Sequence, residues 1–158
     1  MKAQPKAPVQ IALIDDQHIV REAVGALLEG GGGAIVVGSF EHGDGVVESL
    51  VESKAQVALV GFDAQLSNPV ITVSRIARAL PHLPLCALVG LGQKDIVHSA
   101  ISAGCTGVVS SSAARETVIA ALDALVAGQS YVDPGLGGSL LLREFRVRQQ
   151  RSQHNNSH

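Results

Sequence analysis

Short aliphatic runs alternate along the chain with segments in which hydrophobic residues recur every three or four positions. Five of these runs predict buried strands, at residues 9–14, 34–38, 57–60, 85–89 and 107–109. Each run is followed by a segment of helical periodicity, and most of these segments end at glycine or proline. Continuously apolar strands are typical of a parallel sheet that helices cover on both faces. The pattern therefore predicts an α/β fold with a doubly wound, five-stranded parallel sheet and five helices.

Two adjacent carboxylates, Asp15 and Asp16, follow the first predicted strand. In a parallel sheet the functional loops lie at the carboxyl ends of the strands, so this pair lies where a site would form. Carboxylate oxygens are ligands that Mg²⁺ prefers, and a bound cation would offset the repulsion between the two like charges. An acidic turn exposed to solvent, or a helix N-cap, explains the same pair. Both interpretations stay open on spacing alone.

Composition narrows the possible functions. The chain has 158 residues, of which 46% are hydrophobic but only 3% aromatic, so we expect an aliphatic core. Charged residues make up 16%, compared with roughly 25% in an average soluble domain, which disfavours a nucleic-acid surface. Residues 143–158 differ because they contain four arginines and one glutamate. This basic tail has too few apolar residues to order itself, and DNA binding is not expected in this chain.

Cysteine usage and hydropathy indicate a compartment. Cys86 and Cys105 have neither the number nor the spacing of a disulfide scaffold or a zinc site. Two buried thiols in a reducing compartment explain them better than a redox pair. The N-terminus has no apolar run of the signal-peptide kind, and no stretch reaches the roughly 18 apolar residues of a membrane span. We therefore expect a cytoplasmic protein without membrane contact.

The opening of the chain resembles that of a known family. Residues 11–22, with the sequence IALIDDQHIVRE, are similar to the start of a response-regulator receiver domain of the LuxR/NarL type. The resemblance continues through residues 104–107 and 127–134 and covers about residues 8–135. It implies a flavodoxin-like (CheY-like) sheet with the strand order 2-1-3-4-5. We expect three parts: a receiver-like domain at 8–130, a short C-terminal extension with a helical pattern at 131–145, and a basic disordered tail at 146–158.

The resemblance also implies a phosphorylation site, from which this chain departs. In the family an aspartate after the third strand accepts a phosphoryl group, and the acidic pair binds Mg²⁺. A Thr or Ser after the fourth strand and a Lys after the fifth bind the phosphoryl oxygens. These positions fall on Gly61, Val89 and Ser111. None of the three side chains can supply the family's carboxylate, hydroxyl or cation, so we expect them to be vestigial.

These departures determine what we expect of Mg²⁺ binding and of the phosphoacceptor. With only Asp15 and Asp16 retained, we expect Mg²⁺ binding to be weak or vestigial and no cofactor to be required. Asp63, two residues beyond Gly61, is an alternative phosphoacceptor if the strand end shifts. Such a shift moves the carboxylate by about 6–7 Å, beyond inner-sphere reach of a metal held by the acidic pair.

The predicted function is that of an atypical receiver, or pseudo-receiver, in signal transduction and transcription regulation. It is expected to act by protein–protein interaction without phosphorylation. We expect it not to be an enzyme and to have no catalytic residue. A partner protein or a second copy would dock on the last helix, from Ala113 to Val126, and its neighbours. A histidine kinase is a further candidate partner.

Three other functions stay open. The chain could be a working phosphorelay receiver that uses Asp63 with Mg²⁺. It could be the input domain of a truncated LuxR/NarL-type transcription factor, since the helix-turn-helix domain of such relatives is not in this sequence. A neutral pocket beside Gly61, Val89 and Ser111 could also bind an uncharged metabolite.

Overall fold

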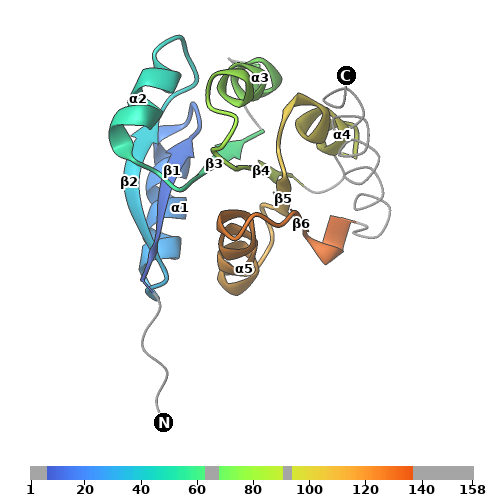
Figure 1. The fold of residues 1–158 in the computed structure, drawn as a ribbon. Coiled ribbons are helices and arrows are strands. Elements are labelled where there is room, and N and C mark those ends of the chain that lie inside the picture. The colour runs from blue at the N-terminus through green and yellow to red at the C-terminus, as the bar shows by residue number, and fades with distance from the viewer. Residues whose placement is uncertain (1–6, 63–67, 91–93, 137–158) are drawn as a thin grey trace.

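The computed structural model describes residues 7–62, 68–90 and 94–136 (Figure 1). Within them strands and helices alternate as the hydrophobic pattern predicts. The strands are β1 (Val9–Ile14), β2 (Ala34–Phe40), β3 (Val57–Gly61), β4 (Leu85–Val89), β5 (Gly107–Ser110) and β6 (Tyr131–Val132). The helices are α1 (His18–Glu29), α2 (Val46–Ser53), α3 (Pro69–Ala79), α4 (Lys94–Ala103), α5 (Arg115–Val126) and the short 3₁₀ helix η1 (Pro134–Leu136).

The sheet is parallel throughout, with the strand order β2-β1-β3-β4-β5-β6. The predicted order of the first five strands is confirmed, but the prediction of five strands was wrong. Tyr131 and Val132 pair with Gly107 and Val108 and add a sixth strand. A strand of two residues is too short to show a hydrophobic pattern, and only its pairing with β5 defines it.

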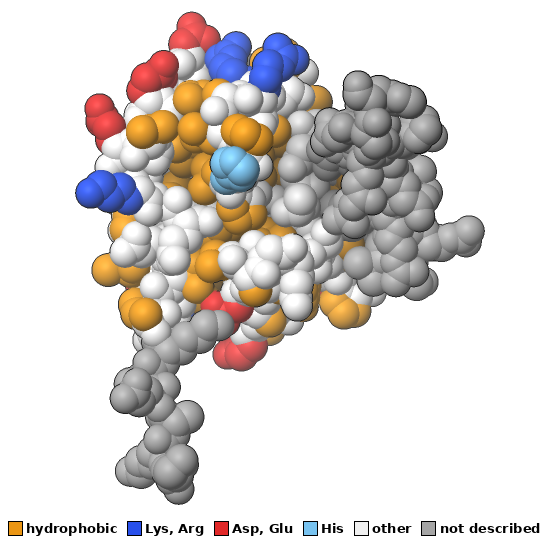
Figure 2. Space-filling view, viewed as in Figure 1, with side chains coloured by type: hydrophobic (Ala, Val, Ile, Leu, Met, Phe, Trp, Pro, Cys, Tyr) orange, Lys and Arg blue, Asp and Glu red, His pale blue; other side chains and the backbone are white. Residues whose placement is uncertain are grey.

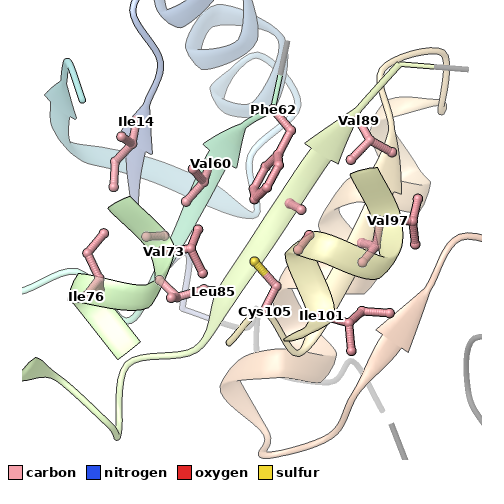
Figure 3. Close-up of a cluster of buried hydrophobic side chains, with 14 of the residues drawn as sticks. Ile14, Val60, Phe62, Val73, Ile76, Leu85, Val89, Val97, Ile101 and Cys105 are labelled. Atoms are coloured by element: carbon pink, nitrogen blue, oxygen red, sulfur yellow. The ribbon is translucent and has the colours of Figure 1, made fainter. Parts of the chain in front are cut away.

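Helices cover both faces of the sheet, so there are two cores. On one face α2, α3 and α4 pack over a cluster that includes Val60, Phe62 and Val89 (Figure 3). On the other face α1 and α5 pack over a second cluster built from Val, Leu, Ile and Ala. As expected from the composition, both cores are dominated by aliphatic side chains. Burying the helices' apolar faces in this way stabilises them more than their intrinsic propensity does.

The two cysteines lie in different cores. Cys105 belongs to the cluster under α3 and α4, whereas Cys86 belongs to the cluster under α1 and α5, so the sheet separates them. Both are buried, and burial raises the pKa of the Cys86 thiol to about 12. This arrangement agrees with buried thiols and excludes a disulfide between the two.

The first turn of α3 shows how the sequence sets a helix start. Asn68 is the N-cap of α3 and accepts a hydrogen bond from the N–H of Val70 at 3.0 Å, and Pro69 takes the first helical position. In the described part of the chain, no helix has the length and hydropathy that crossing a membrane requires.

The glycine run after α1 forms a turn that α5 holds in place. Arg115 donates hydrogen bonds to the carbonyl oxygens of Leu27 (3.0 Å), Leu28 (2.9 Å) and Gly32. A Cβ atom on Gly31 would lie 2.7 Å from Arg115 Cζ, so glycine is needed for this approach. Arg115 thereby binds carbonyl groups that the end of α1 leaves without helical partners, and it joins α1 to α5.

Candidate functional site

The carboxyl ends of β1, β3, β4 and β5 lie along one edge of the sheet, and the predicted site positions lie on it. Ile14 pairs with Val60, Gly61 with Leu88, and Val89 with Ser110. This register brings Asp15, Gly61, Val89 and Ser111 to the same edge, as the resemblance implied. Asp63 lies outside the described residues.

The Asp15 carboxylate fills the space that a side chain at position 61 would take. A Cβ atom added to Gly61 would overlap Asp15 Oδ2 and lie 2.9 Å from Asp15 Cγ. The other carboxylate oxygen, Oδ1, accepts a hydrogen bond from the N–H of Gln17 at 2.8 Å. Asp15 is therefore turned over the end of β3, and the glycine at position 61 makes room for it.

A buried arginine lies beside Asp15. The Arg21 side chain is only 8% exposed; it donates to the carbonyl oxygen of Asp15 and, at 2.9 Å, to Ser39 Oγ. Its third contact is His18 Nδ1, at 3.2 Å. Sequence analysis missed this residue, although a signal exists. Arg21 lies one and two turns before Gly25 and Leu28, the other buried residues of α1, so it is a cation at a core position.

Asp16 points toward a different part of the fold. Its Oδ1 accepts a hydrogen bond from the N–H of His42 at 3.3 Å, and the His42 ring contacts Thr72 Oγ1 of α3 through Nδ1 at 2.9 Å. The remaining polar atoms, Asp16 Oδ2 and His42 Nε2, are buried and make no hydrogen bond within the described part of the chain. His42 and Thr72 were also missed, because only the fold brings residues 30 positions apart into contact.

The acidic pair alone does not fit a Mg²⁺ site. Mg²⁺ needs near-octahedral oxygen coordination, and one oxygen of each carboxylate already accepts a backbone N–H. Within residues 7–62, 68–90 and 94–136, no three His, Cys, Asp or Glu side chains converge as a metal site requires. We therefore derive no chemical step through a metal at Asp15 and Asp16.

The β4 strand end is apolar, and the residue that follows β5 is an uncharged serine. The Val89 side chain is fully buried in the core (Figure 3), and its carbonyl accepts the N–H of Ser111 at 2.8 Å. Ser111 itself is exposed. A valine cannot donate a hydrogen bond to a phosphoryl oxygen, and Ser111 has no charge to offset one.

A carboxylate from the C-terminal segment binds the end of β5. Asp133 is buried, 7% exposed; its Oδ2 accepts the N–H of Ser110 at 3.0 Å and its Oδ1 accepts the N–H of Gly135 at 2.9 Å. The Ser110 hydroxyl pairs with that of Ser112 at 2.9 Å. An acid from the segment after α5 thus lies at the end of β5. Nothing in the sequence marks this contact, since Asp133 follows Ser110 by 23 residues.

The cavity that described residues form beside Gly61 is small. Its volume is about 10 Å³, and its lining includes Asp15, Arg21, Gly61 and Leu88 but neither Val89 nor Ser111. This is about the space that one water molecule occupies. The expected neutral pocket shared by Gly61, Val89 and Ser111 is therefore not formed by these residues.

Comparison with known proteins shows what the chain is similar to. No protein-family model matches the chain. It is 22% identical over 144 residues to the response regulator GacA of Pseudomonas aeruginosa, which covers 91% of this chain and 67% of GacA. It is 23% identical over 137 residues to the response regulator UvrY of Escherichia coli, which covers 87% of this chain and 63% of UvrY. Its relatives are LuxR/NarL-type response regulators.

Solved structures show which part of such proteins the chain matches. The isolated REC domain of RcsB from Salmonella enterica serovar Typhimurium, with the phosphomimetic BeF₃⁻, aligns with a TM-score of 0.69 at 22% identity, covering 85% of this chain and 98% of that domain. A LuxR-family response regulator from Aurantimonas sp. SI85-9A1 aligns with a TM-score of 0.72 at 22% identity, covering 89% and 99%. The chain therefore has the receiver fold, and it spans about two thirds of the length of GacA and UvrY.

Proposed function

We propose that this receiver works in two-component signalling as a regulatory interaction module to which no phosphoryl group is transferred. The main support is the pairing of Asp15 with Gly61. The residue at the acceptor position has no carboxylate, and the space for one is filled by Asp15. Phosphoryl transfer depends on positioned groups that stabilise developing charge. Val89 and Ser111 supply no such groups, so we propose a binding function rather than an enzymatic one.

The surface for the partner is α5 with its neighbours. Val118, Leu122 and Leu125 are buried and anchor this helix to the sheet, and Arg115 fixes its first turn to α1. Outward it presents small residues such as Ala120, together with Val126, which is 39% exposed. A rigid helix with small outward residues permits close approach of a partner helix. We propose that a partner protein docks here, with a histidine kinase among the candidates.

The regulatory setting is proposed from the relatives. One is a transcriptional regulatory protein, LnrK of Bacillus subtilis, and one solved structure contains two RcsB dimers bound to two parallel DNAs. We propose that this chain also serves transcription regulation, in the cytoplasm, through the proteins that it binds. The two buried thiols suit that reducing compartment.

Beryllofluoride with Mg²⁺ tests this proposal. It forms a stable phosphoryl mimic on a receiver that has a working acceptor and metal site. We expect the amide NMR spectrum of the whole chain to stay unchanged when both are added. Shifts that cluster on Asp15, Asp16 and the β3–α3 loop, and that disappear in an Asp63→Asn variant, would show a working switch and overturn the proposal.

A further inference from the structure

The outward sides of α2 and α3 each have an exposed aliphatic side chain, and they carry opposite charges. On α2, Val51 is 58% exposed; Glu48 lies one turn before it and Glu52 directly after it, and both glutamates are exposed. These three residues form the acidic stripe. On α3, Ile71 is 54% exposed and is followed on the same side by Arg75 and Arg78. These three form the basic stripe.

Each stripe is an exposed aliphatic side chain beside two like charges. The two helices are neighbours on one face of the sheet, and Figure 2 shows acidic side chains over α2 and the loop before it, and basic side chains over α3. Arg75 reaches Asp44 in that loop at 3.1 Å, but in the described part of the chain Glu48, Glu52 and Arg78 form no ion pair. Most charges of the two stripes are thus not paired within one molecule, as far as the described residues show.

A groove runs along the basic stripe. Its volume is about 520 Å³, and Val70, Ile71 and Ala79 form its apolar walls while Arg75 and Arg78 border it. Such a groove fits an aliphatic side chain that has two carboxylates close beside it on its helix. Val51 between Glu48 and Glu52 has this chemistry.

We propose that a second copy of the chain docks on this face, with α2 of each copy packed against α3 of the other. A two-fold axis between α2 and α3 makes both contacts equivalent, because each copy then supplies one acidic and one basic stripe. Val51 of one copy enters the groove of the other, and its two glutamates meet the two arginines. The self-association surface is then separate from α5, which stays accessible to a different partner.

The interface is small, so the association should be weak. Contacts between two pairs of short helices fall at the low end of specific interfaces. Exposed ion pairs contribute more to specificity and to salt dependence than to affinity. We therefore expect a monomer–dimer equilibrium that depends on concentration and shifts toward the monomer as salt is added.

A charge-swap experiment tests the proposal. The basic variant, Glu48→Arg with Glu52→Arg, makes both stripes positive; the acidic variant, Arg75→Glu with Arg78→Glu, makes both negative. By sedimentation velocity of the full chain we expect each variant alone to associate about 10- to 100-fold more weakly than the natural chain. An equimolar mixture should associate at least as well as the natural chain, because every contact is again between opposite charges.

Matched controls separate this interface from other causes. Glu22→Arg with Glu116→Arg makes the same change in net charge on α1 and α5, and it should leave the association unchanged. Far-UV circular dichroism and thermal melting show that each variant folds. A natural chain that stays monomeric at every concentration, or a mixture that associates no better than its components, overturns the proposal. Association that survives both charge variants but is lost in Ala120→Arg would assign the dimer to α5; it would overturn this inference and leave the proposed function standing.

Discussion

The two halves of the sheet's carboxyl edge differ in what satisfies their polar groups. At the β1 end the carboxylates of Asp15 and Asp16 accept hydrogen bonds from the backbone N–H groups of Gln17 and His42. At the β4 and β5 ends the strands' own residues supply no carboxylate, and the carboxylate of Asp133 accepts a hydrogen bond from the buried N–H of Ser110. Both halves therefore meet the fold's need for paired backbone groups. Only the β1 half still resembles a site for a cation, so folding and phosphoryl chemistry place separate demands on the same edge.

Removing Asp133 should have the largest effect. In Asp133→Ala the N–H groups of Ser110 and Gly135 lose their acceptor, and the edge strand β6 loses an anchor. We expect the free energy of unfolding to fall by about 2–4 kcal/mol, because buried donors without partners are costly. Urea denaturation measures the change, with Glu116→Ala on the exposed side of α5 as a near-neutral control. A loss below about 0.5 kcal/mol would show that the β5 end does not depend on this carboxylate.

An aspartate at position 61 should displace the Asp15 carboxylate at the β1 end of the edge. In Gly61→Asp the new side chain overlaps the Asp15 carboxylate, and two like charges meet. We expect a loss of about 1–3 kcal/mol in the free energy of unfolding, since Asp15 must leave its hydrogen bond with Gln17.

A double-mutant cycle isolates the contact behind that loss. Asp15→Ala should recover most of the stability in the Gly61→Asp background, although it is mildly destabilising by itself. Additive effects of the two substitutions would contradict the overlap.

The strands and their carboxyl ends could be predicted from the sequence, whereas several contacts at the site could not. The aliphatic runs predicted β1 to β5, and counting without gaps placed Gly61, Val89 and Ser111 at the strand ends where the structure has them. The contacts of His42 and Asp133 were out of reach, because their partners lie 30 and 23 residues away and depend on packing. The strand β6 was missed for a similar reason, since its two residues are defined by their pairing and not by a pattern.

Alkaline pH should lower the free energy of unfolding through the buried thiol of Cys86 in β4. Its pKa is raised from 9.0 to about 12 by burial, so the folded thiol keeps a proton that the unfolded chain loses. Stability is complete below pH 9 and falls between pH 9 and 12, by about 1.4 kcal/mol per pH unit. Unfolding free energies of the natural chain and of Cys86→Ala, measured from neutral to alkaline pH, should converge as the pH rises. Parallel curves would show that the thiol is not shielded.

Magnesium should have the smallest effect. One oxygen of each carboxylate, Asp15 and Asp16, accepts a hydrogen bond from a backbone N–H, and no third acidic side chain joins them within the described ranges. Physiological Mg²⁺ should therefore barely raise the melting temperature. Differential scanning fluorimetry with Mg²⁺, and with Ca²⁺ for comparison, measures the shift. A rise of several degrees that Asp16→Asn abolishes would mean that the β1 half is a more complete metal site than we infer.

The central claim is that this receiver does not accept a phosphoryl group, and intact-mass spectrometry tests it most directly. The full chain is incubated with acetyl phosphate and Mg²⁺, beside a phosphorylatable receiver as a positive control. We predict that the mass of the chain does not change while the control gains a phosphoryl group. A phosphoryl adduct that hydroxylamine removes, and that Asp63→Asn prevents, would contradict the account.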